Sequence, residues 1–141
     1  MARTLSKRFA DELATFVNNP NMRSVKKSEY GVGTGQCAYY GGTVGKSCKG
    51  CFVGRFLPKA MRIDLDKKYH NEPIRAIAAE YEGLPDIVMD NLNLMVSLQR
   101  LHDGDTFWNK EGLTGDGKKL LKRIVQDNAV LKMKDFKKFL S

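Results

Sequence analysis

Hydrophobic residues recur at helical spacing near the start of the chain. Between residues 5 and 17 they fall three or four positions apart, which predicts an amphipathic helix with a single apolar stripe. A hydroxyl at Thr4 or Ser6 can cap the first turn, and Pro20 lies where the pattern stops. The stripe consists of Leu5, Phe9, Leu13, Phe16 and Val17.

The same spacing returns in four segments of the second half. A short helix is expected to begin at residues 71–73 and to end at Gly83. One continuous helix is expected to open at Pro85-Asp86 and to run to His102-Asp103, with Gly104 as its C-terminal stop. Residues 103–117 are polar and contain glycine, which is typical of a loop. Two basic amphipathic segments follow, with apolar stripes at 120–125 and 130–140.

Glycine dominates the region between these helical patterns, since eight of the 13 glycines lie between residues 31 and 54. Residues 20–35 are interpreted as a loop. Two β-like runs, 37–40 and 51–57, flank a glycine-rich turn and predict an antiparallel hairpin, with a third strand near 61–65. The expected fold class is therefore α+β: a helix-rich single domain with a small Gly-rich antiparallel hairpin or three-stranded sheet.

Composition fits one ordinary globular domain over residues 1–141. The chain is 42% hydrophobic and 28% charged, near the averages for folded domains. It shows neither an apolar stretch long enough to span a bilayer nor the apolar core of a secretion signal. We therefore expect a cytoplasmic protein without a membrane partner.

Charge is divided into three blocks along the chain: residues 1–62 carry +8, residues 63–117 carry −6 and residues 118–141 carry +6. Basic surfaces attract phosphate-bearing partners. The basic C-terminal helical segment, 118–141, can equally serve as an oligomer interface or as a plain helix pair covering the core. The three blocks can also neutralise one another in the folded protein.

Residues 41–47, Gly-Gly-Thr-Val-Gly-Lys-Ser, partly match a phosphate-binding loop. The full motif needs a glycine where Tyr40 stands and a helix afterwards. Because neither condition is met, a nucleoside triphosphatase is disfavoured. Lys46 and Lys49 beside a glycine-rich turn nevertheless remain candidate anion ligands.

Three cysteines within fifteen positions suggest two further kinds of chemistry. Cys48-x2-Cys51 with Cys37 and a histidine, His70 or His102, supplies the donor set of a zinc site, although only one knuckle is present. The alternative is that these are small buried thiols in a reducing compartment. The favoured expectation is no cofactor.

Nucleophilic catalysis would use Cys37 or Cys51 as the thiol and His102 as the base. Asp103 follows His102 directly, and adjacent helical side chains diverge, so Asp103 is not expected to orient the imidazole. The alternative makes His102 a helix-end residue whose ring bonds nearby backbone. We favour a non-catalytic protein.

Residues 36–110 carry a recognisable pattern: Cys37-x-Tyr39, Cys51-x-x-Gly54-Arg55, and Leu98-Gln99-x-x-His102-Asp103. This resembles a group of small uncharacterised proteins encoded in tailed-phage genomes. The inserted Cys48-Lys49-Gly50 departs from that pattern by lengthening the turn, and the basic tail lies outside it. The resemblance implies a role in an infected bacterium, in host takeover or counter-defence.

We expect the hairpin to close over the helix that ends at Asp103 and so to form a polar pocket with an aromatic wall. In the alternative, Arg55 pairs with Asp103 as a structural tie, Gln99 and His102 satisfy loop backbone, and Trp108 fills the core. The expected ligand-binding residues are Tyr39, Lys46, Lys49, Arg55, Gln99, His102 and Trp108.

The leading functional hypothesis is non-catalytic binding of a phosphate-bearing partner, either a nucleotide signal or a nucleic acid. The alternative is a protein–protein inhibitor or regulator of a host protein, whose acidic middle meets a basic host surface while the basic ends hold a homo-oligomer together. A Cys/His-dependent enzyme is the third hypothesis.

Overall fold

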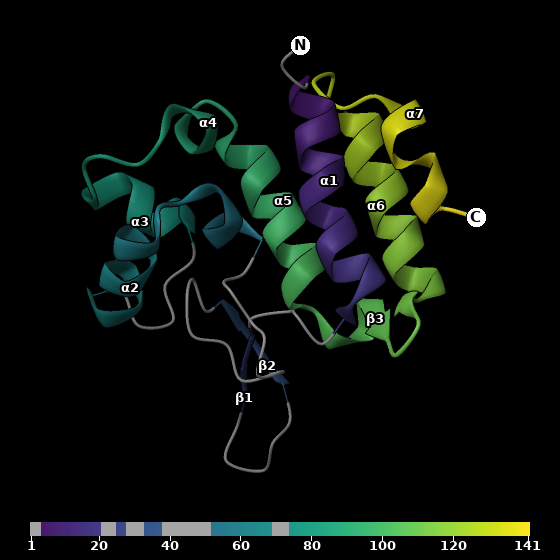
Figure 1. Cartoon of the computed structure of the whole chain (residues 1–141), viewed down its shortest axis with the longest axis horizontal. Helices are drawn as coiled ribbons and strands as arrows, with labels where there is room; N and C mark the ends of the chain where they lie inside the picture. The colour runs from purple at the N-terminus through teal and green to yellow at the C-terminus, as the bar shows by residue number, and fades with distance from the viewer. Residues whose placement is uncertain (1–3, 21–24, 28–32, 38–51, 69–73) are drawn as a thin grey trace.

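Three helices form the centre of the molecule in the computed structural model: α1 (Leu5–Asn18), α5 (Leu92–Asp103) and α6 (Gly115–Asp127) lie side by side (Figure 1). The structure describes residues 4–20, 25–27, 33–37, 52–68 and 74–141. The remaining elements are β1 (Val25–Lys27), β2 (Gly33–Cys37), the 3-10 helix η2 (Val53–Phe56), α2 (Lys59–Lys68), α3 (Ile74–Glu80), α4 (Asp86–Met89), η3 (Asp105–Phe107), β3 (Trp108–Asn109), β4 (Gly112–Leu113), α7 (Met133–Phe136) and η4 (Lys137–Phe139).

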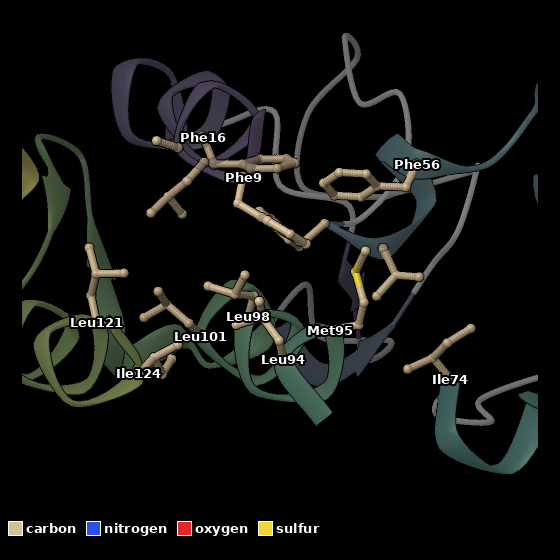
Figure 2. Close-up of a cluster of buried hydrophobic side chains, with 14 of the residues drawn as sticks. Phe9, Phe16, Phe56, Ile74, Leu94, Met95, Leu98, Leu101, Leu121 and Ile124 are labelled. Carbon is tan, nitrogen blue, oxygen red and sulfur yellow. The ribbon is translucent and has the colours of Figure 1, made fainter. Parts of the chain in front are cut away.

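The apolar stripe of α1 is the upper wall of the core in Figure 2, and α5 supplies the opposite wall. Phe9, Leu13 and Phe16 are at most 1% exposed, as expected from their spacing. The Thr4 hydroxyl accepts a hydrogen bond from the backbone N–H of Lys7 (3.1 Å), so Thr4 caps the helix. Ser6 instead accepts from the backbone N–H of Lys132 at 2.8 Å, which joins the start of α1 to α7.

A tight connection sets α6 against α5. After η3 the chain forms the small antiparallel hairpin β3–β4, in which Asn109 pairs with Gly112. Gly112 has φ +127, a conformation that favours glycine. At Gly117, a Cβ would collide with the carbonyl oxygen of Phe107, so α6 approaches this connection more closely than any other residue type would allow.

The predicted position of the sheet is wrong. The described hairpin joins β1 to β2, with Val25 opposite Cys37, and so includes residues expected to form a loop. Within the predicted run 51–57, residues 53–56 form the 3-10 helix η2 instead of a strand, and 61–65 lies in α2 instead of a third strand. Of the predicted run 37–40, residues 38–40 lie outside the described residues. The spacing of the apolar residues in 52–57 explains the first error. Phe52 and Val53 lie four positions before Phe56 and Leu57. Residues four apart share one side of a helical turn, whereas a strand would place its apolar residues at alternate positions.

The helical predictions are confirmed with one correction. Residues 85–103 form two helices, α4 and α5, because the backbone breaks at Asn91 (φ −128, ψ 35). The Asn91 side-chain amide donates back to the carbonyl of Ile87 at 2.9 Å, which stabilises the corner. The predicted loop at 103–117 contains η3 and the β3–β4 hairpin.

The expected fold class is confirmed: the protein is a helix-rich α+β domain with a small antiparallel hairpin. No helix in the described part of the chain combines the length and apolar character needed to cross a bilayer. Cytoplasmic localisation stays a prediction.

Candidate functional site

Three polar side chains form a hydrogen-bonded cluster on the last turn of α5. The Nε2 of Gln99 donates to Oδ1 of Asp103 at 2.6 Å, and Nδ1 of His102 lies 2.7 Å from the same oxygen. Because an ionised carboxylate only accepts, the imidazole carries its proton on Nδ1 and donates it to Asp103. The turn therefore presents one carboxylate oxygen with two donors fixed on it.

His102 is completely buried, and its ring meets Phe16 edge to face at 4.8 Å between centroids. Asp103 is 14% exposed at its side chain. The expectation that Asp103 does not orient His102 is wrong, since the final helical turn lets the short Asp103 side chain bend back to the ring. The predicted bond from the His102 ring to nearby backbone stays a prediction beside this contact with the carboxylate.

Gln99 links the cluster to the segment that carries Arg55. Its Oε1 accepts a hydrogen bond from the backbone N–H of Val53 at 2.9 Å, so η2 packs on the end of α5. This confirms the structural alternative in which Gln99 satisfies loop backbone. Residues 53–56 lie against α5 as a 3-10 helix and not as a strand of the expected hairpin.

Arg55 does not pair with Asp103. Its Nε forms an ion pair with Oε2 of Glu12 at 2.9 Å, with both side chains largely buried. The expected Arg55–Asp103 tie is therefore wrong, and the guanidinium links η2 to α1. Trp108 is 6% exposed and donates its indole N–H to the carbonyl of Leu101 at 2.7 Å, so the alternative that Trp108 fills the core is confirmed.

A pocket of about 370 Å³ opens beside the cluster, between α3 and α5. We refer to it as the α3–α5 pocket. Gln99 and Asp103 contribute polar groups, while Phe107 takes the place expected for Trp108 as the aromatic wall. Its described lining consists of Ile74, Val96, Gln99, Arg100, Asp103, Gly104 and Phe107.

A smaller groove of about 170 Å³ lies on the other side of α5, towards α6. Arg100 lines both this α5–α6 groove and the α3–α5 pocket, and Arg123 of α6 lines the groove with Asp127. Among the described residues, neither arginine forms an ion pair. Sequence reasoning missed both, although helical spacing puts Val96, Arg100 and Asp103 on one face of α5.

The cysteine-based sites fall largely outside the described residues. Cys37 ends β2, which packs against α5. Within the described ranges no group of histidine, cysteine and acidic residues is arranged to hold a metal ion, and zinc stays a prediction. The remaining sequence-predicted site residues outside the described ranges are Tyr39, Lys46, Lys49, Cys48, Cys51 and His70.

Comparison with protein-family models, with curated proteins and with solved structures finds no match to this chain.

Proposed function

We propose that this protein binds a small phosphate-bearing ligand, a nucleotide, without transforming it. The base would occupy the α3–α5 pocket and the phosphate would lie between Arg100 and Arg123. The observation that carries the proposal is the position of Arg100, which lines an apolar pocket on one side and a groove with a second arginine on the other.

The pocket has the size and lining that a nucleobase requires. Its volume of about 370 Å³ falls in the range of small-molecule sites, roughly 300–1,000 Å³. Ile74, Val96 and Phe107 supply apolar and aromatic surface for a flat ring. The carboxylate of Asp103, held by Gln99 and His102, is an acceptor for the amino and imino hydrogens of a base.

The α5–α6 groove supplies positive charge for the phosphate. A guanidinium is always ionised and binds phosphate oxygens through paired donors. Arg100 and Arg123 have no ion partner among the described residues, so neither must break a pair to bind an anion. Asp103 lines the pocket and Asp127 lines the groove, and the repulsion of phosphates by these two carboxylates favours a small nucleotide over a nucleic-acid backbone.

Our proposal keeps the host-takeover or counter-defence role that the resemblance of residues 36–110 implies. The alternative role, inhibition or regulation of a host protein through the acidic middle of the chain, remains a prediction from the charge blocks alone.

Calorimetric titration at low salt tests the proposal with a panel of mononucleotides and cyclic nucleotides. We expect at least one nucleotide to bind and to raise the melting temperature, and Arg100→Gln to weaken binding by about tenfold or more, equivalent to ~1.4 kcal/mol. Lys119→Gln is the matched control, because Lys119 is exposed on α6 and lines neither hollow. Equal weakening in both variants, or no binding to any nucleotide, would contradict the proposal.

A second candidate is a thiol enzyme that uses Cys37. It is favoured by the bond from His102 Nδ1 to Asp103, which is the arrangement that orients an imidazole towards a nucleophile, and by the packing of β2 on α5. We rank it second because His102 is 0% exposed, whereas a catalytic base must reach its substrate.

Alkylation with iodoacetamide tests this candidate. An activated Cys37 would react faster than Cys48 and Cys51, and Asp103→Asn would slow it, because the imidazole would lose its orienting carboxylate. Asp105→Asn is the matched control, since Asp105 is exposed in η3. An unchanged rate in Asp103→Asn would remove the enzyme from consideration.

A further inference from the structure

The polar side chains in the described lining of the α3–α5 pocket differ in what they can offer a nucleobase. They are Gln99, Arg100 and Asp103. The Gln99 amide is engaged at both ends, because its Oε1 accepts from the backbone N–H of Val53 at 2.9 Å and its Nε2 donates to Asp103 at 2.6 Å. With Arg100 assigned to the phosphate, the Asp103 carboxylate is the side chain that meets the polar edge of the base.

The Asp103 carboxylate is held in one orientation by its neighbours on α5. Gln99 Nε2 and His102 Nδ1 both contact its Oδ1, at 2.6 and 2.7 Å. Two donors on one oxygen restrict rotation of the carboxylate, and His102, which supplies one of them, is completely buried. Because an ionised carboxylate accepts hydrogen bonds and donates none, the pocket wall carries a positioned acceptor.

Low exposure makes this acceptor selective. The Asp103 side chain is 14% exposed, so a base in the pocket would displace much of the water that reaches the carboxylate. A base atom with a lone pair placed against Asp103 would repel the carboxylate and leave it without a replacement for that water, which costs binding free energy. A base edge that carries donors would replace the lost water.

The common nucleobases differ in the edge that they present to such a group. Guanine carries two adjacent donors, the ring N1–H and the exocyclic amino group. Adenine and cytosine each place one amino group beside a ring nitrogen that accepts, and uracil places one N–H between two carbonyl oxygens. Among these four bases, guanine is therefore the one whose edge complements a carboxylate with two neighbouring donors.

We propose that the α3–α5 pocket selects guanine nucleotides and that Asp103 determines this specificity. The inference rests on the proposed nucleotide binding and adds which base is bound. Ile74, Val96 and Phe107 offer apolar contact to a base of any kind, so the discrimination among bases falls to the carboxylate.

Calorimetric titration of the full chain at low salt tests the inference with guanosine, inosine, adenosine, cytidine and uridine, each as the 5′-monophosphate and as the 3′,5′-cyclic monophosphate. We expect guanine to be bound about tenfold or more tightly than adenine in at least one of these two sets, since a good paired contact discriminates by that order. Inosine, which lacks the amino group, should fall between them.

The outcomes of this titration separate the two proposals. A nucleotide of adenine, cytosine or uracil that binds as tightly as its guanine counterpart would overturn guanine selection and leave nucleotide binding intact. Absence of binding by every nucleotide in both sets would overturn both proposals.

Asp103→Asn supplies a second test, in which the specificity should change instead of simply being lost. The carbonyl of the introduced amide can still accept from Gln99 and His102, which places the amide NH2 where the second carboxylate oxygen stood. That NH2 opposes the guanine donors and complements the C2 carbonyl of xanthine. Guanosine monophosphate should therefore bind about tenfold or more weakly, and xanthosine monophosphate should bind more tightly than to the wild type.

Asp105→Asn is the matched control, because Asp105 is exposed in η3 and does not line the described pocket. It should leave the affinities for guanosine and xanthosine monophosphates near their wild-type values. A ratio of these two affinities that Asp103→Asn leaves unchanged would overturn the specificity assigned to Asp103.

Discussion

At the residue scale, Gln99 does the most to position the site. It accepts from the N–H of Val53 and donates to Asp103, so one amide both anchors η2 and holds the carboxylate on the pocket wall. Its position three residues before His102 put both on one helical face and was visible in the sequence. Its partner Val53 was not, because a bond across 46 positions depends on tertiary packing.

Replacing Gln99 with leucine should destabilise the fold by about 1–3 kcal/mol, since the buried N–H of Val53 loses its acceptor and leucine cannot replace it. Chemical denaturation measures this loss. Gln126→Leu is the control, because Gln126 is exposed on α6, and it should change the free energy of unfolding by less than about 0.5 kcal/mol. Equal effects of the two variants would show that the Gln99 bonds contribute nothing.

At the element scale, amphipathic helices were predictable and the small sheet was not. Periodicity located α1, α3 and α6 because their apolar stripes are buried against one core. The glycine-rich region carries no comparable periodicity, and the apolar run at 52–57 suits a strand and a buried helical turn equally well by composition. The break between α4 and α5 was missed because Asn91 ends one helix by a local side-chain bond without a proline or glycine.

The helix α6 approaches η3 closely at Gly117, and a substitution there tests this packing. Gly117→Ala should destabilise the protein by about 1–3 kcal/mol, because the added methyl group collides with the Phe107 carbonyl and forces the elements apart. Gly115→Ala, two residues earlier with open space around the position, should be neutral or slightly stabilising. Thermal unfolding of the two variants compares them directly, and a neutral Gly117→Ala would contradict the described packing.

The Arg55–Glu12 ion pair should couple η2 to α1. A double-mutant cycle with Arg55→Gln and Glu12→Gln is expected to give an interaction energy of about 1 kcal/mol, since both side chains are mostly buried. The Lys68–Asp64 pair, with side chains 61% and 38% exposed, should give no more than about 0.5 kcal/mol by the same method. Similar values for both pairs would show that burial adds nothing to this contact.

At the scale of the whole molecule, the fold brings together charged side chains from different charge blocks of the sequence. Arg100 belongs to the acidic middle and Arg123 to the basic tail, and both line one groove. The net charge of each block could not show that these two side chains share a groove. The sequence singled out Gln99, which lines the α3–α5 pocket, although its role in binding stays a prediction. It could not identify Arg100, Phe107 or Val96 as pocket residues, because that depends on how α3 and α6 pack around α5.

The most direct test of nucleotide binding at Arg100 uses amide and methyl NMR spectra of the full chain. The spectra are recorded during titration with a nucleotide that calorimetry has shown to bind. We predict chemical-shift changes concentrated at Ile74, Val96 and Phe107 around the α3–α5 pocket, with smaller ones near Arg123, and little change along residues 132–138. Shifts confined to the lysines of α7 and η4, with the pocket methyl groups unaffected, would contradict the account.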